Sequence, residues 1–219
     1  MVNEEKADLI RGIISALNVE TLSRRIESVD VMIEPKYREL FDGLHCEVIV
    51  PDVQKQIEVE NKRLLESREY YLNNFNDSDV YHKTYHPYNE IVAKVQEIAS
   101  KYPQVVRISS LGRSIENRDI PVVHITGTSG TTKKSIYING GIHAREWISA
   151  ATVVYIIQTF AEKYGNDQEV TNLLNEVEFA ITPMSNPDGY SYSWDSDRMW
   201  RSNFNFFFLF FSLKKQISL

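Results

Sequence analysis

A short β-type run that ends in two glycines and leads into a long apolar helix constrains the fold of this chain more than any other feature. Residues 135–139 form the run, Gly140 and Gly141 follow it, and residues 146–164 are apolar around the helical cylinder before Gly165 ends them. A helix that is apolar all round has to be buried, and the preceding strand supplies a sheet for it to cover. The segment therefore predicts a helix packed on a β-sheet.

The other segments beyond residue 80 alternate in the same way. We predict helices at 88–101 and 168–175, and strands at 105–109, 120–126 and 177–182, whereas the proline and glycine residues at 183, 187 and 189 indicate loops. Apolar residues recur at helical spacing in the helices, and β-branched runs bounded by turn residues mark the strands. Strands that alternate with helices are typical of an α/β domain, in which helices cover the faces of one sheet.

The first 80 residues differ from the rest of the chain in charge. They hold 10 Lys and Arg against 17 Asp and Glu, whereas the other residues hold 14 against 13. The polar run 73–79 is rich in turn-forming residues, so we place a domain boundary near residue 78. Within the front segment we predict helices at 3–16 and 52–75, the second capped by Asp52, and short strands at 29–33 and 47–50.

Composition excludes several classes of protein. With 42% hydrophobic and 25% charged residues the chain is ordinary for a globular protein, and its net charge of −6 disfavours nucleic acid as a partner. The single cysteine, Cys46, excludes an internal disulfide framework and a cysteine-rich zinc site. The acidic N-terminus has no signal-peptide pattern, and no apolar run is long enough to predict a membrane-spanning helix. We therefore expect neither nucleic acid nor a membrane as a partner.

The glycine pair is followed by two residues that can bind a metal. His143 offers an imidazole nitrogen and Glu146, three residues later, offers carboxylate oxygens, both where the predicted strand gives way to the helix. Zn²⁺ takes such mixed nitrogen and oxygen ligands, and sites in open α/β sheets lie at the carboxyl ends of strands. A histidine and a glutamate at this spacing also occur by chance, with the glutamate complementing the helix dipole. The pair by itself leaves both interpretations open.

Longer runs around this pair resemble a known family. The run 140–148 is similar to the zinc-binding segment of the metallocarboxypeptidases of the pancreatic A and B type, and the runs 186–190 and 198–201 fit the same family. Residues 41–61 resemble the end of that family's propeptide. The resemblance extends over residues 28–202.

The resemblance implies a fold, an organisation and an activity. Residues 1–78 are expected to form a small α/β propeptide domain, residues 79–202 the N-terminal part of a catalytic domain with a mixed β-sheet flanked by helices, and residues 203–219 a Phe-rich tail without a family counterpart. It also implies a secreted zymogen, monomeric with its propeptide on the same chain, that releases amino acids from the C-termini of peptides and proteins. An acidic front segment suits docking on an arginine-lined surface.

The resemblance also assigns roles to five residues. His143 and Glu146 match two of three zinc ligands, Arg145 and Arg198 match substrate-binding arginines, and Arg201 matches the arginine that polarises the scissile carbonyl and stabilises the oxyanion. Zn²⁺ held by three protein ligands activates a water molecule and polarises a carbonyl. Without the resemblance, the preferred interpretation of Arg198 and Arg201 is that they are solvated surface residues beside Trp200.

The family pattern ends soon after Arg201. The third zinc-binding histidine, the Asn–Arg pair for the substrate carboxylate, a tyrosine and the glutamate base have no matching position in the sequence. Residues 203–219 instead hold six of the ten Phe. Most residues of this tail are of types that can be encoded by codons made only of A and T, which suggests translated non-coding sequence. We therefore expect this chain to hold zinc weakly, to be inactive and to fold poorly, with an open sheet edge.

The other histidines are expected to be structural. His82 and His86 are four residues apart, but Pro87 disfavours a helix there, so we expect them in a loop. His124 lies in a predicted strand as a hydrogen-bonded structural residue, and His45 has no partner signature in the sequence.

Two other functions stay open beside a zinc carboxypeptidase. One is a related zinc amidohydrolase that uses the same His–Glu pair on small acyl-amino acids. The propeptide-like front segment and the run 198–201 disfavour it. The other is a non-catalytic binding or inhibitory product that keeps the prodomain fold.

Overall fold

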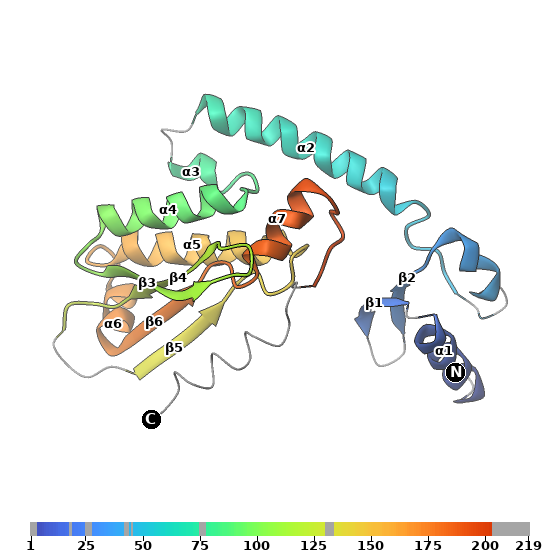
Figure 1. Cartoon of the computed structure of the whole chain (residues 1–219). Helices are drawn as coiled ribbons and strands as arrows, with labels where there is room; N and C mark the ends of the chain where they lie inside the picture. The colour runs from blue at the N-terminus through green and yellow to red at the C-terminus, as the bar shows by residue number, and fades with distance from the viewer. Residues whose placement is uncertain are drawn as a thin grey trace. The chain divides into compact units, whose positions relative to one another are not determined.

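The computed structural model describes residues 4–17, 19–24, 28–41, 44, 46–74, 78–129 and 134–202 (Figure 1). Contacts divide the chain into two compact units, residues 1–55 and 56–219. This division falls earlier than the sequence-based boundary near residue 78, because Glu60, Ser67 and Arg68 of helix α2 (Val53–Asn73) are hydrogen-bonded to residues that follow that boundary. Asp52 caps this helix as predicted, since its carboxylate accepts from the Lys55 N–H at 3.1 Å.

The first unit contains a helix, a two-stranded sheet and a 3₁₀ helix. These are α1 (Glu4–Ala16), β1 (Glu20–Arg24), β2 (Val29–Met32) and η1 (Pro35–Phe41), and β1 pairs antiparallel with β2. The predicted first helix and the strand that begins at residue 29 are confirmed. The predicted strand at 47–50 is wrong: these residues pair with no strand of the described segments, and Ile49 is 68% exposed. β-Branched residues form a strand only where a neighbouring strand and a core are available.

A four-stranded mixed sheet lies at the centre of the second unit (Figure 1). Its strands are β3 (Val106–Arg113), β4 (Asp119–Ile125), β5 (Lys134–Asn139) and β6 (Val177–Thr182), in the spatial order β3-β4-β6-β5. β4 is antiparallel to both β3 and β6, whereas β5 and β6 run parallel. The predicted α/β class with a mixed sheet flanked by helices is confirmed.

Five helices accompany this sheet in the described part of the second unit, beside α2. They are α3 (Ser78–Tyr81), α4 (Tyr88–Lys101), α5 (Trp147–Lys163), α6 (Gln168–Glu176) and α7 (Pro187–Asp195). As Figure 1 shows, α4 and α5 lie side by side along the sheet, and they contact each other as well as its strands. None of the helices described is long and apolar enough to cross a membrane.

The core of the second unit lies between α4, α5 and the sheet. Its buried side chains include Ile91, Val95 and Ile98 of α4, Val154 and Ile157 of α5, and Val123, Ile125, Phe179 and Ile181 of the strands. The apolar residues of α4 recur every three or four positions, which places them on one face. Burial of α5 is less complete than predicted, because Ile148 and Tyr155 are 60% and 55% exposed. Only one side of α5 faces the sheet and α4.

Helix α7 forms where the sequence suggested only loops. The Asn186 side chain accepts from the Gly189 N–H at 2.9 Å, and Pro187 occupies the first turn. Proline is favourable there because the first N–H groups of a helix have no intrahelical acceptor. An asparagine followed by proline is therefore a helix-start signal, which the loop interpretation overlooked.

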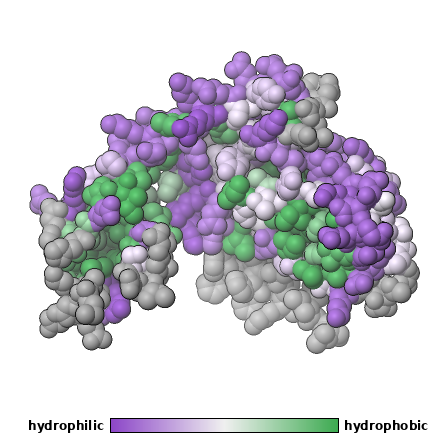
Figure 2. Space-filling view, turned by 180° about the vertical axis from the view of Figure 1, so that it is seen from behind, coloured by the Kyte–Doolittle hydropathy of each residue, from purple (hydrophilic) through white to green (hydrophobic). Residues whose placement is uncertain are grey.

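Apolar side chains reach the surface of the second unit, and Figure 2 shows such patches in the view from behind. Ile136 and Tyr137 of β5 are each 45% exposed. Within the segments that the structure describes, β5 pairs with β6 alone, so its other edge has no strand beside it. This edge matches the expectation of an open sheet.

Candidate metal and substrate site

The glycine pair allows the chain to turn sharply from β5 into α5. Gly141 has a φ of 64°, a conformation that residues with a Cβ rarely adopt. A Cβ at Gly141 would overlap the Met184 side chain, and a Cβ at Gly140 would lie 2.9 Å from the Pro183 carbonyl oxygen. The turn thus packs directly against the segment that follows β6. The hydrogen bond from the Ser185 N–H to the Gly140 carbonyl, at 3.0 Å, joins the two.

His143 and Glu146 lie together on this turn, at the carboxyl end of β5. His143 Nδ1 is 3.1 Å from Glu146 Oε1, and the two side chains are 34% and 50% exposed. Glu146 occupies the N-cap position of α5, but its carboxylate makes no capping hydrogen bond and contacts His143 instead. The pair therefore presents a nitrogen and an oxygen donor to solvent side by side. The structure brings these two predicted residues together.

The donor types of this pair fit Zn²⁺, which accepts mixed histidine and carboxylate ligands. Among the residues that the structure describes, no group of three or more His, Cys, Asp and Glu side chains comes together at one point. His143 and Glu146 are thus two candidate ligands. The described part of the chain adds no third one.

Arg198 is held beside this turn by three partner residues. Its Nε and Nη2 donate to the two carboxylate oxygens of Glu60 at 2.7 and 2.9 Å, and its Nη1 donates to the Arg145 carbonyl oxygen at 2.9 Å. Its guanidinium also lies 3.8 Å from the centre of the Trp147 ring, in a cation–π contact. With its side chain only 16% exposed, Arg198 is not a solvated surface residue.

Arg145 and Arg201 lie on the same two segments. Arg145 Nη1 donates to the Met199 carbonyl oxygen at 3.3 Å, and the Arg201 carbonyl accepts from the Ala144 N–H at 3.2 Å. The Arg201 residue itself is exposed. All five predicted site residues therefore lie on two chain segments, 143–146 and 198–201, that are hydrogen-bonded to each other.

Aromatic residues beneath the turn strengthen this junction. Trp147 stacks on Trp194 of α7 with ring centres 4.2 Å apart, and its indole N–H donates to Ser193 Oγ at 2.8 Å. Neither Trp147 nor Glu60 had a sequence signal for its role. Both act through partners that are far away along the chain, which spacing alone does not reveal.

The histidines predicted to be structural are hydrogen-bonded within the protein. His124 lies between Ser109 Oγ, 2.8 Å from its Nε2, and Glu178 Oε1, 3.1 Å from its Nδ1, across three strands. This confirms the prediction that His124 is a satisfied structural residue. His45 lies outside the residues that the structure describes.

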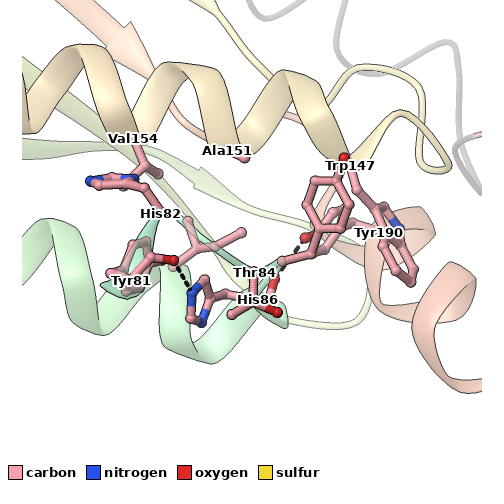
Figure 3. A pocket seen from close by; sticks show the side chains of 10 residues that line it. Tyr81, His82, Thr84, His86, Trp147, Ala151, Val154 and Tyr190 are labelled. Atoms are coloured by element: carbon pink, nitrogen blue, oxygen red, sulfur yellow. Dashed lines mark hydrogen bonds between the residues drawn. The ribbon is translucent and has the colours of Figure 1, made fainter. Parts of the chain in front are cut away.

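His82 and His86 lie in the segment after α3, as predicted, and not on one helix. Figure 3 shows them with Tyr81, Trp147 and Tyr190 around a cavity of about 10 Å³, which is no larger than one water molecule needs. His86 stacks on Tyr81, and its Nδ1 is 2.6 Å from Glu90 Oε2. Burial lowers the pKa of His86. His86 is buried and His82 is partly buried, and within the described segments neither belongs to a group of three or more potential metal ligands.

The chain is similar to several known proteins. A family model described as zinc carboxypeptidase matches residues 91–205, which is just over half of the chain. The inactive metallocarboxypeptidase ECM14 of Saccharomyces cerevisiae is 38% identical over 131 residues, covering 58% of this chain and 30% of the relative. Human carboxypeptidase B2 is 34% identical over 165 residues, covering 75% of this chain and 37% of the relative.

The fold also has a counterpart among solved structures. The crystal structure of carboxypeptidase A from Helicoverpa armigera matches 93% of this chain and 51% of its own length with a TM-score of 0.80, at 24% identity. This likeness concerns the fold. The chain spans about a third of the length of the curated relatives above and about half of the solved one.

Proposed function

Because the chain belongs to the zinc carboxypeptidase family, we propose that the turn at His143 and the segment around Arg198 form a metallocarboxypeptidase-type site. Its substrates would be the C-termini of peptides and proteins. The observation that carries this proposal is the junction of segments 143–146 and 198–201, which brings two metal donors and three arginines to the carboxyl end of β5. Strand ends of open α/β sheets are where such sites lie.

The residues of this junction have complementary roles in the proposal. His143 and Glu146 would hold Zn²⁺, which when bound polarises a carbonyl and lowers the pKa of a water molecule. Arg201 is exposed beside them and can stabilise negative charge that develops on the carbonyl oxygen. Arg145 and Arg198 carry guanidinium groups, which bind carboxylates and carbonyl oxygens of a peptide.

We further propose that residues 1–78 act as an activation segment. Glu60 of α2 takes up two donors of Arg198, the residue assigned to substrate binding. Arg68 and Ser67 of α2 anchor this helix through hydrogen bonds with Glu90 and Thr84, respectively. A substrate that needs the Arg198 guanidinium would have to displace Glu60. This arrangement supports a zymogen, which by analogy with the family would be secreted and monomeric.

A non-catalytic member of the same family is the second candidate function. One relative carries the name inactive metallocarboxypeptidase, and the described residues supply two metal donors. Two protein ligands hold Zn²⁺ less firmly than three. We therefore expect the 219-residue chain to bind zinc weakly and to release no amino acids on its own. The amidohydrolase alternative gains no support from the α2 contact with Arg198.

A peptidase assay with zinc distinguishes an active carboxypeptidase from a non-catalytic member of the family. Full-length chain is incubated with Zn²⁺ and N-blocked dipeptides that end in Phe or Arg, and released amino acids are measured by chromatography. Zinc-dependent release that is lost in His143→Ala and Arg201→Ala, and kept in His82→Gln, would establish an enzyme. Zinc binding at His143 without release of amino acids would support the non-catalytic function. Absence of zinc at His143 contradicts both.

A further inference from the structure

Asn186 lies buried between the two segments that make up the site. Its side-chain Nδ2 donates to the Ile142 carbonyl oxygen at 3.3 Å and to the Ser202 carbonyl oxygen at 3.1 Å. Its Oδ1 accepts from the Gly189 N–H at 2.9 Å, and the residue is 2% exposed. All the strong hydrogen-bonding groups of one carboxamide are thus in use.

The two carbonyl groups that Asn186 holds flank the site residues directly. Ile142 precedes His143, and Ser202 follows Arg201. One NH₂ group therefore binds the backbone next to the metal donors and the backbone next to the proposed oxyanion arginine. The Asn186 N–H adds a third tie, since it donates to the Gly141 carbonyl oxygen at 3.1 Å.

Asn186 and the Ser202 carbonyl oxygen are tightly packed against Gly189. A Cβ at Gly189 would lie 2.6 Å from the Ser202 carbonyl oxygen and 2.8 Å from Asn186 Oδ1, so only glycine allows the close approach. Buried carbonyls that lose their donor carry a desolvation cost, and the chain would move to satisfy them. The carboxamide thus helps to set the separation between the two segments, together with the hydrogen bond from the Ala144 N–H to the Arg201 carbonyl oxygen.

We propose that Asn186 is a positioning residue, whose carboxamide fixes the turn of His143 and Glu146 relative to Arg201. The role of the positioned residues rests on the proposed function. The positioning itself rests on the four hydrogen bonds of Asn186 described above. Groups hydrogen-bonded to a metal ligand commonly change metal affinity 10- to 100-fold when they are replaced, and we expect Asn186, which binds the backbone one residue away, to act at the low end of this range. Asn186 touches neither the metal donors nor a substrate, so its effect would be indirect.

Asn186→Ser and Asn186→Asp separate positioning from helix capping. Both side chains still accept from the Gly189 N–H as N-caps, so α7 should form. Neither offers an NH₂ group, so the Ile142 and Ser202 carbonyls lose their shared donor. Asn172→Ser, at an exposed position of α6, is the matched control, because its Oδ1 accepts a hydrogen bond from Gln168 of the same helix.

The test measures the ring signals of His143 by NMR in histidine-labelled full-length chain, together with Co²⁺ affinity by chelator competition. We expect both Asn186 variants to keep the wild-type circular dichroism, to shift the His143 signals but not those of His124, and to bind Co²⁺ about tenfold more weakly. Folded variants with unchanged His143 signals would overturn the inference. So would failure of Asn186→Ser to fold, because Asn186 would then be a folding residue. Shifted signals without metal binding in the wild type would leave the inference standing and contradict the proposed function.

Discussion

At the scale of single residues, the site is defined by Arg198 and its contact with Glu60. The two side chains are joined by two hydrogen bonds, and they are 16% and 39% exposed. Partial exposure screens the charges, so the contact is worth less than a fully buried pair. It is still stronger than a flexible surface pair, because the planar guanidinium and the carboxylate match in two hydrogen bonds.

Replacing Glu60 by glutamine tests this contact. Glu60→Gln keeps the size of the side chain but removes its charge, and we expect the unfolding free energy to fall by about 1–2 kcal/mol. Urea unfolding of the full-length chain measures the change. Glu69→Gln, at an exposed position of the same helix, is the control and should leave stability unchanged. Equal effects of the two substitutions would show that Glu60 has no special role.

Arg68 makes a second contact whose strength depends on pH. Its Nη2 donates to Glu90 Oε1 at 2.6 Å, and its Nη1 donates to the Tyr85 carbonyl oxygen at 3.1 Å. Burial would raise the pKa of Glu90, but the hydrogen bonds from Arg68 and His86 outweigh it and hold the pKa below the ordinary 4.5. Because the folded-state pKa is lowered, this stabilisation is present above pH 4.5 and is lost as the pH falls further.

Arg68→Met should therefore destabilise the protein in a pH-dependent way. We expect a loss of about 2 kcal/mol in unfolding free energy at pH 7 and a clearly smaller loss at a second, acidic pH that is low enough to protonate Glu90. Urea unfolding at the two pH values measures both, with the exposed Arg63→Met as the control. A loss of the same size at both pH values would mean that the Glu90 charge does not contribute.

At the scale of secondary-structure elements, the turn between β5 and α5 places the metal donors. Gly141 combines a φ of 64° with contact against Met184, whereas Gly165 has a φ of 83° and open space around its Cβ position. A substituent at Gly165 therefore meets only backbone strain, while one at Gly141 also meets a packed side chain.

Gly141→Ala should cost more stability than Gly165→Ala. We expect about 3 kcal/mol for Gly141→Ala, from backbone strain plus overpacking, and about 1 kcal/mol for Gly165→Ala. Thermal unfolding of both variants gives the comparison. If the two substitutions lowered the melting temperature equally, the close packing of the turn against Met184 would be refuted.

The spacing of apolar residues predicted the helices and strands that bury one face. It failed where contacts with distant parts of the chain decide the local structure. The helices α4 and α5 and the strands β4 to β6 follow from apolar spacing, because burial against a common core imposes that spacing. Residues 47–50 have strand-forming side chains but no neighbouring strand among the described residues. Helix α7 was missed because its proline and glycine suggested loops, although proline in a first turn favours a helix.

The same difference applies to the candidate site. His143 and Glu146 stand three residues apart, so sequence spacing reveals their proximity. The contact between Glu60 and Arg198 joins residues on different elements, and no local pattern encodes it. Asn186 could be found only in part: its position before proline indicates an N-cap, but its contacts with Ile142 and Ser202 depend on tertiary structure.

At the scale of the whole molecule, the open edge of β5 is the main liability. Ile136 and Tyr137 are each 45% exposed, and in the described segments β5 pairs on one side only. An exposed apolar strand edge promotes pairing with another chain. We therefore expect the 219-residue chain, monomeric when dilute, to self-associate as its concentration rises.

Ile136→Lys should reduce this self-association, because a charge on an edge strand opposes strand pairing between chains. Size-exclusion chromatography with light scattering over a range of concentrations measures it. Ile115→Lys, at a 59% exposed position in the turn after β3, is the control. If both variants self-associated less to a similar extent, the change in net charge, and not the β5 edge, would explain the effect.

The family assignment, the turn after β5 and the arginines beside it all lead to one central claim, that His143 and Glu146 bind zinc. Calorimetric titration of Zn²⁺ into the full-length chain tests it most directly. We expect one Zn²⁺ to bind weakly per chain, and we expect this binding to be lost in His143→Ala and in Glu146→Gln but retained in His82→Gln. Zinc binding that survives both His143→Ala and Glu146→Gln, or no zinc binding by the folded wild-type chain, would contradict it.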